Sequence, residues 1–128
     1  MAVLIIQGQL EGLNGYTKAN RTNPYVGAKM KKDMERIIGW CIKQQLKGVH
    51  YSVPVKIDFT WIEPNRKRDL DNIAFAKKFI LDALVKNGIL ESDGWKGVCG
   101  FTDSFKVNKQ RPRVEVEINE VEYADSDC

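Results

Sequence analysis

The chain has 128 residues, of which 43% are hydrophobic and 29% charged, a composition that fits one ordinary globular domain. No apolar run approaches the roughly 20 residues that a membrane-spanning helix needs, and the first residues lack the basic region of a signal peptide. We therefore expect a cytoplasmic protein with no membrane partner. All 20 Lys and Arg residues lie at or before Arg113, whereas six of the 17 acidic residues follow it. A basic body favours a polyanionic partner, although a solvated surface could look the same.

The first part of the chain predicts a strand followed by a long polar loop. Residues 3–10 are β-branched and apolar at their start, which favours a strand. Residues 16–25 are polar and read as a loop, in which aromatic and cationic side chains alternate. This mixture suits contact with nucleic acid, but turn chemistry alone would also explain it. The candidate DNA-binding residues of this part are Asn14, Tyr16, Lys18 and Arg21.

Residues 28–46 predict an amphipathic helix, because apolar side chains recur at helical spacing. Lys31 and Lys32 near its start could meet phosphates, although exposed lysines usually only solvate a helix face. His50, the only histidine, has no acidic neighbour within four residues and reads as a loop residue.

Residues 53–62 alternate apolar and polar side chains, which predicts a half-buried strand. A helix follows from about Asp71 to Asn87, with Gly88 as its C-terminal cap. Its expected buried stripe consists of Ile73, Ala76, Phe79, Ile80, Ala83 and Leu84.

Two further strands are expected near the C-terminus, at residues 99–107 and 114–118, and the turn residues at 108–112 predict that they form a hairpin. The expected order is therefore β-α-β-α-β-β, in a single α+β domain whose mixed sheet is packed by helices. We place this domain at residues 1–123 and expect residues 124–128 to be a frayed acidic tail.

The stretch between the second strand and the second helix carries the candidate chemistry. Asp69 and Asp71 face the same way if the backbone between them is extended, and Leu70 then points into the core. Carboxylate oxygens of this kind suit Mg²⁺. Asp93 could complete the set, but it lies beyond the far end of a helix about 25 Å long. Either the chain doubles back or a second subunit supplies this third carboxylate.

The alternative interpretation is structural. Asp71 would cap the helix, and Asp69 would pair with Arg66 or Arg68. Acidic residues at helix starts are common, so residue types alone favour this alternative. Asn72 weakens it, because it adds a third oxygen-bearing side chain within four residues, more than a cap requires.

Three motifs in order resemble the RusA family of Holliday junction resolvases, small endodeoxyribonucleases typical of phages and prophages. The motifs are Lys67-Arg68-Asp69-Leu70-Asp71-Asn72, Phe79-Ile80-Leu81-Asp82-Ala83-Leu84 and Gly88-Ile89-Leu90-Glu91-Ser92-Asp93. D-x-D-N alone would be a weak signal, whereas the ordered set is strong.

The resemblance implies a Mg²⁺-dependent crossover junction endodeoxyribonuclease, with Mn²⁺ as a substitute and no small-molecule cofactor. It implies that Asp69, Asp71 and Asp93 bind the metal and that Lys78 or Lys77 contacts the scissile phosphate, with spacing in favour of Lys78 and of Asp93 over Glu91. It also implies a homodimer that resolves a four-way DNA junction by paired, symmetric nicks in recombination and repair. The candidate DNA-binding residues around the motif are Arg66, Lys67 and Arg68.

Two other functions fit the same residues. A non-catalytic DNA-binding or architectural protein would need the basic body but not the acidic residues. A nuclease of broader branch specificity would need both.

Overall fold

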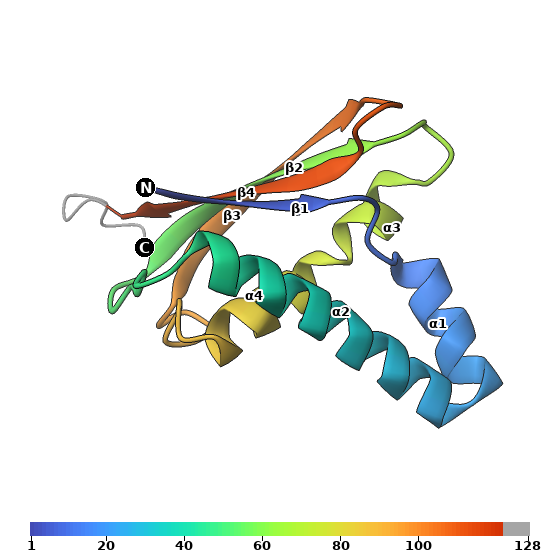
Figure 1. The fold of residues 1–128 in the computed structure, drawn as a ribbon, viewed down its shortest axis with the longest axis horizontal. Coiled ribbons are helices and arrows are strands. Elements are labelled where there is room, and N and C mark those ends of the chain that lie inside the picture. The colour runs from blue at the N-terminus through green and yellow to red at the C-terminus, as the bar shows by residue number, and fades with distance from the viewer. Residues whose placement is uncertain (122–128) are drawn as a thin grey trace.

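The computed structural model describes residues 1–121, which form one four-stranded sheet and four helices (Figure 1). The elements in chain order are β1 (Ala2–Gln7), α1 (Leu13–Thr22), α2 (Pro24–Gln45), β2 (Val55–Glu63), α3 (Leu70–Ala74), α4 (Lys77–Lys86), β3 (Val98–Val107) and β4 (Arg113–Glu120). The predicted α+β class is confirmed. The predicted tail, residues 124–128, lies outside the described residues. No helix within residues 1–121 is long and apolar enough to cross a membrane.

The sheet is mixed, with strand order β1-β4-β2-β3. β4 runs antiparallel to both β1 and β2, whereas β3 runs parallel to β2. The predicted hairpin of the last two strands is therefore wrong, because β2 lies between them. The connection after β3 crosses the end of β2, where the Asn108 N–H donates to the Glu63 carbonyl at 2.8 Å.

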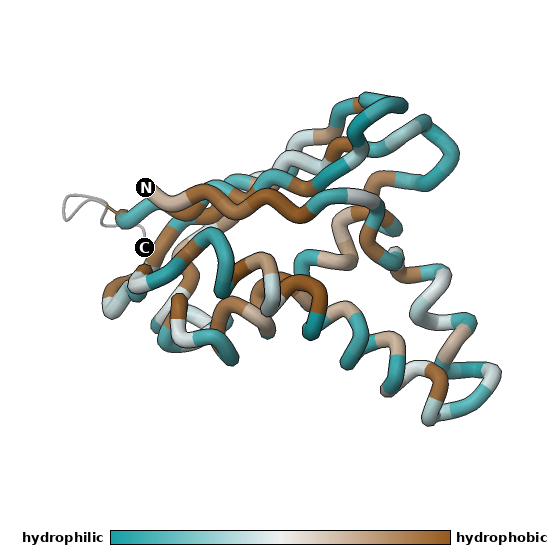
Figure 2. The backbone as a smooth tube through the Cα atoms, in the orientation of Figure 1, coloured by the Kyte–Doolittle hydropathy of each residue, from teal (hydrophilic) through white to brown (hydrophobic). Residues whose placement is uncertain are grey.

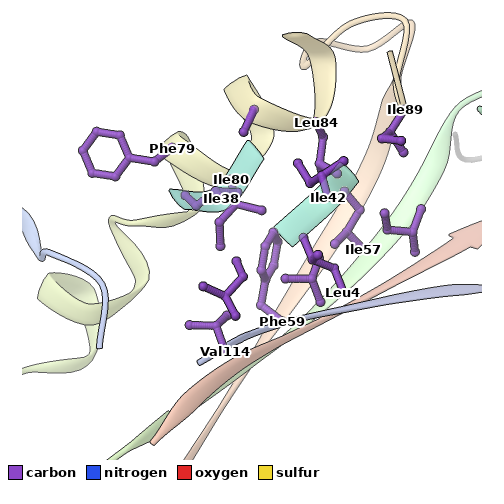
Figure 3. Packing of buried hydrophobic residues seen from close by; sticks show 14 of the residues in the cluster. Leu4, Ile38, Ile42, Ile57, Phe59, Phe79, Ile80, Leu84, Ile89 and Val114 are labelled. Carbon is purple, nitrogen blue, oxygen red and sulfur yellow. The ribbon is translucent and has the colours of Figure 1, made fainter. Parts of the chain in front are cut away.

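β2 follows the predicted period of two. Its inward side chains, Val55, Ile57, Phe59 and Trp61, are all buried. In Figure 1, α2 and α4 lie on one face of the sheet, and Figure 2 shows hydrophobic segments of these helices turned toward hydrophobic strands. Figure 3 shows the resulting core, in which Ile38 and Ile42 of α2 and Ile80 and Leu84 of α4 meet the sheet. The predicted stripe of the second helix is buried throughout.

Helix α1, at residues 13–22, overlaps the loop that the sequence predicts at residues 16–25. The helix is mostly polar and exposed, and its apolar stripe is only three side chains long, Leu13, Tyr16 and Ala19. α2 begins at Pro24, four residues before its predicted start, because the Asn23 side chain accepts the Tyr25 N–H at 2.8 Å and caps it.

The predicted helix from residue 71 to 87 is two helices. At the break, the Ala76 N–H bonds to the Ile73 carbonyl and the Lys78 N–H to the Phe75 carbonyl, so the spacing tightens from four residues to three. No glycine or proline marks this position. Phe75 packs there against Tyr16 and Phe79, with ring centroids 5.7 and 5.8 Å away. The break is therefore fixed by packing against α1, which lies almost 60 residues earlier.

Candidate active site

A buried ion pair holds the segment that leads from β2 to the aspartates. The Arg68 guanidinium donates to both Glu63 carboxylate oxygens at 2.9 Å, and Glu63 is only 7% exposed. A third guanidinium N–H donates to the Leu10 carbonyl at 2.9 Å, and the Gln9 amide donates to Glu63. Arg68 thus joins the ends of β1 and β2 from inside the protein, a role that differs from the DNA contact predicted for it.

Asp69 is exposed and stands directly before α3 in extended conformation, with φ −69° and ψ 154°. Its carboxylate makes no hydrogen bond or ion pair with any residue in the described part of the chain. The predicted alternative, an ion pair with Arg66 or Arg68, is therefore not formed, since Arg68 is held by Glu63. Both carboxylate oxygens of Asp69 therefore remain available to a ligand.

A pocket of about 300 Å³ lies beside Asp69. The pocket is lined by the segment after β2 and by the end of β3. Its lining residues include Arg66, Arg68, Asp69, Phe105, Lys106 and Val107. Arg66 and Lys106 line this pocket together with Asp69, so their positive charge would attract an anion toward it. Glu63 and Lys106 also line the pocket and are absent from the sequence-based predictions, because only the fold brings residue 106 next to residue 69.

Asp71 lies in the first turn of α3, where one carboxylate oxygen accepts the Asn72 N–H at 2.9 Å. This contact is local, but Asp71 is not the helix cap that the structural alternative predicts, because the N-cap residue is Asp69, which makes no side-chain cap bond. The second oxygen of Asp71 has no partner within residues 1–121. The helix begins at Leu70, so the assumption of an extended backbone between the aspartates is wrong. Leu70 is 56% exposed and does not anchor the pair in the core.

The Asn72 side chain stabilises the start of α1. It is 8% exposed, and its side-chain oxygen accepts the Asn14 N–H at 2.9 Å. Gly12, the N-cap residue of α1, has no side chain to accept this bond, so Asn72 supplies it from α3. A Cβ at Gly12 would lie 2.4 Å from that oxygen. Asn72 therefore joins α1 to the segment that carries the aspartates. Its side-chain oxygen, which in the sequence argued against a simple helix cap at Asp71, is taken up by this contact.

The predicted DNA-binding residues of the N-terminal part lie on α1. Lys18 and Arg21 are exposed and line a hollow together with Asn14. Tyr16 is half-buried, with its ring 5.7 Å from Phe75, so it packs α1 onto α3. On α2, Lys31 is half-buried and Lys32 is exposed, whereas Arg66 and Lys67 are exposed beside Asp69.

The two candidate lysines have different surroundings. Lys77 forms a 2.7 Å ion pair with Asp103 of β3 and lies 3.8 Å from the ring centroid of Phe101. Asp103 also accepts the indole N–H of Trp61 at 2.8 Å. Lys78 is exposed, and its ammonium group has no partner among the described residues. Lys78 therefore has an unpaired ammonium group and Lys77 does not, while the choice of the lysine that contacts a phosphate stays a prediction.

Asp93 lies at the opposite end of the sheet from Asp69. The loop that contains it ends at Gly97, whose carbonyl accepts the Val55 N–H at 3.0 Å, at the start of β2. Asp69 follows the other end of β2. This strand is nine residues long, so about 26 Å separates its two ends. Figure 1 shows α3 and the start of β3 at these opposite ends. Within the described residues, no three acidic, His or Cys side chains come together as a metal site.

Asp93 and Glu91 also differ in their partners. The Nε2–H group of His50 donates to a Glu91 carboxylate oxygen at 3.0 Å, and the Nδ1 atom lies 2.6 Å from the Gly88 carbonyl oxygen. Asp93 is exposed and has no partner in the part of the chain that the structure describes. Glu91 is therefore engaged in the fold, while Asp93 is available as a ligand.

These contacts predict a pH-dependent contribution of His50 to stability. The hydrogen bond to the Gly88 carbonyl, and then the one to Glu91, raise the pKa of His50 above its usual value. A raised pKa in the folded state means that the stabilisation is complete below the unfolded pKa of about 6.5 and is lost as the pH rises through the folded pKa. Urea unfolding of the parent and of a His50→Gln variant should therefore differ most at about pH 5.5 and least at about pH 8.5. A Glu91→Gln variant should show a weaker pH dependence than the parent, and an equal one would contradict this assignment.

This chain is similar in sequence to known proteins. The family model described as Endodeoxyribonuclease RusA matches residues 13–119, which is most of the chain. The chain belongs to the RusA family. A relative from Aquifex aeolicus, named crossover junction endodeoxyribonuclease RusA, is 36% identical over 55 residues, which are 42% of this chain. That match spans only 41% of the relative, so it identifies kinship rather than the relative's whole activity.

The RusA family match includes both aspartates of the D-x-D-N motif, Lys78 and Asp93, and it extends from α1 to β4. Only β1 precedes the matched range. The family therefore accounts for the whole α1-to-β4 unit in which the candidate residues lie, and the resemblance in the sequence is confirmed.

Proposed function

We propose that this RusA-family protein is a Mg²⁺-dependent endodeoxyribonuclease that resolves four-way DNA junctions in recombination. The observation that carries the proposal is the unpaired carboxylate of Asp69, two residues before Asp71 and beside a pocket lined by Arg66 and Lys106. An ordinary helix entrance would pair these acids with the neighbouring cations, and here the buried Glu63 takes up Arg68 instead. The relative from Aquifex aeolicus carries the name of the same activity.

The donor set fits a hard divalent cation. Asp69 and the second oxygen of Asp71 are exposed carboxylate oxygens, and Mg²⁺ is commonly bound through one or two carboxylates together with waters and phosphate oxygens. Bound Mg²⁺ lowers the pKa of a water ligand and neutralises charge that develops on a phosphate. Mn²⁺ accepts the same oxygen ligands and is expected to substitute.

The remaining residues act on the DNA. The Lys78 ammonium stabilises negative charge on the scissile phosphate. Arg66, Lys67 and Lys106 hold the backbone beside the carboxylates, while Lys18 and Arg21 on α1 contact a neighbouring stretch. Arg68 acts indirectly, by positioning the segment that carries Asp69.

The third carboxylate comes from a second copy of the chain. Asp93 has no partner within residues 1–121 and lies near the start of β2, whereas the other two aspartates follow the end of that strand, which is about 26 Å long. A two-fold dimer can place Asp93 of each copy at the Asp69 end of the other, and it then makes two equivalent sites. Two equivalent sites match the two like strands that a four-way junction offers for paired nicks.

Incubation with synthetic DNA tests the function. The protein should cut a four-way junction when Mg²⁺ or Mn²⁺ is present and should bind without cutting when EDTA removes the metal. Three-way and linear DNA of the same sequence serve as controls, and equal cutting of all substrates would point to a nuclease of broader branch specificity. Binding without cutting under every metal condition would favour the non-catalytic DNA-binding alternative and overturn the proposal.

A further inference from the structure

A hollow of about 740 Å³ lies between helix α2 and strand β1. Its walls are largely apolar and include Ile5 of β1 and Ile37, Trp40 and Cys41 of α2. Trp40 is 65% exposed and Ile37 is 45% exposed, so two large apolar side chains are left in water here. The hollow shares no lining residue with the pocket beside Asp69. An exposed apolar surface of this kind is typical of a site where another molecule binds.

The side of α2 that faces α4 is cationic instead. A second hollow, of about 360 Å³, borders Trp40 on that side and is lined by Lys32, Glu35, Arg36, Gly39, Lys43 and Asn87. Lys32 and Lys43 are exposed, and neither ammonium group has a partner among the described residues. Trp40 therefore stands between an apolar hollow and two unpaired cations.

The acidic residues of α2 do not cancel these cations. The helix contains five cationic and two acidic residues. Glu35 forms an ion pair with Lys86 of α4 at 2.6 Å, and Asp33 contacts Lys29 at 3.1 Å and Arg36 at 3.0 Å. Both acidic side chains are thus neutralised by their neighbours. The charge that remains unpaired on this side of α2 is positive, and it would attract an anionic partner.

We infer that the outer side of α2 binds an acidic peptide segment of a partner protein, anchored by a bulky apolar side chain. The apolar side chain enters the hollow between α2 and β1, where Trp40 and Ile37 lose their contact with water. Carboxylates on neighbouring residues of the peptide lie on the other side of Trp40, close to Lys32 and Lys43. This binding is independent of the proposed nuclease activity, because the two hollows share no residue with the Asp69 pocket.

Nucleic acid fits this surface less well than a peptide. Proteins that bind single strands combine stacking aromatic side chains with a positively charged groove that follows the phosphates. The hollow on the β1 side offers Arg36 as its cation, and Asp33 already holds that guanidinium. A base placed there would meet the aliphatic Ile5 and Ile37, which give its polar edge no hydrogen-bond partner. An apolar peptide side chain has no such edge.

A second copy of the chain also fits this surface poorly. Contact between two copies of the outer side of α2 would bring unpaired cations together, and like charges across an interface oppose association. The acidic peptide supplies the opposite charge.

A fluorescein-labelled peptide with two adjacent phenylalanines in a run of aspartates tests the inference by fluorescence anisotropy. One matched peptide has serines in place of the phenylalanines, and another has asparagines in place of the aspartates. The probe should bind with a dissociation constant on the order of 10 μM, and each matched peptide at least about tenfold more weakly. Equal binding of either matched peptide, or no binding of the probe at about 1 mM, would overturn the inference.

Variants of the protein locate the site. Trp40→Ala should weaken binding of the probe at least about tenfold, because this ring borders both hollows. Trp95→Ala is the matched control, since Trp95 is 81% exposed and lines neither hollow, and it should change the affinity by less than about twofold. Lys43→Gln should weaken the probe about threefold and leave the asparagine peptide unchanged. Equal losses in the two tryptophan variants would place the binding elsewhere and contradict the inference.

The other possible occupants are tested with the same Trp40→Ala protein. Its binding of single-stranded and four-way DNA, and its mass by light scattering, should equal those of the parent. A loss of DNA binding would assign the surface to nucleic acid, and a lower mass would assign it to a second copy, so either result overturns the inference. In a Trp95→Phe background, where the remaining Trp61 is buried, the probe should protect Trp40 from acrylamide quenching. Unchanged quenching with the probe bound would also reject this site.

Discussion

An equal mixture of Asp71→Asn and Asp93→Asn chains is expected to nick a four-way junction that neither variant cuts alone. Each change removes a carboxylate charge while it keeps the side-chain volume, so each homodimer lacks a ligand in both sites. In a mixed dimer with shared sites, one site contains both substitutions and the other contains none. About one quarter of the parent's sites should therefore be recovered after random exchange of subunits. Denaturing gels of a labelled junction measure this recovery.

The form of the product provides the control. A mixed dimer has one working site, so it should leave junctions nicked on one strand, whereas the parent gives paired nicks. Mixing Asp69→Asn with Asp71→Asn chains should restore nothing, because both residues lie on the same side of the shared site. Absence of recovery from the Asp71→Asn and Asp93→Asn mixture, with mixed dimers present, would show that Asp93 acts within its own chain or outside the reaction.

Arg68→Met is expected to lower the free energy of unfolding by about 3 kcal/mol, because it leaves the carboxylate of Glu63 without its partner. Glu63 is 7% exposed and would retain the Gln9 amide as its remaining hydrogen-bond donor. The Leu10 carbonyl would lose its donor as well. In a domain of this size the melting temperature should fall by about 10 °C, and urea unfolding should show the same loss.

Arg66→Met serves as the matched control for Arg68→Met, since Arg66 is exposed and has no ion pair within the described residues. It should change stability by no more than about 0.5 kcal/mol. A Glu63→Leu and Arg68→Met double variant should regain part of the loss, because it removes both charges rather than one. Equal stabilities of the two single variants would mean that the Glu63–Arg68 pair does not hold the segment.

Local patterns in the sequence predict local structure well in this chain. The alternation around Phe59 predicts β2, and the helical spacing of Phe79 and Leu84 predicts a buried stripe, because both periodicities follow from the backbone geometry of one element. Pairing partners depend on the whole fold. The alternation of residues 114–118 predicts a strand but gives no sign that β2 stands between it and β3.

The motif residues are readable from the sequence, whereas their surroundings are not. Spacing favours Lys78 over Lys77, and this choice stays a prediction, but the ion pair of Lys77 with Asp103, 26 residues later, is not readable from the sequence. No local pattern predicts that Arg68 belongs to Glu63 or that Asn72 caps α1 from a distance of 58 residues. α1 itself is missed for the same reason, because Gly12 gives no capping signal and the cap is supplied by another helix.

β1 is a terminal strand of the sheet, and the Gln45 side chain bonds to its backbone: the amide oxygen accepts the Ile5 N–H and the amide nitrogen donates to the Ile5 carbonyl, both at 2.8 Å. A subunit with two pairing edges can add neighbours on both sides and grow into an open-ended fibre, whereas a subunit with a single usable edge is saturated by one neighbour. The Gln45 amide occupies the hydrogen-bonding groups of Ile5, so it would block the addition of another strand at this edge of the sheet. Solubility and stoichiometry would then both depend on one glutamine at the end of α2.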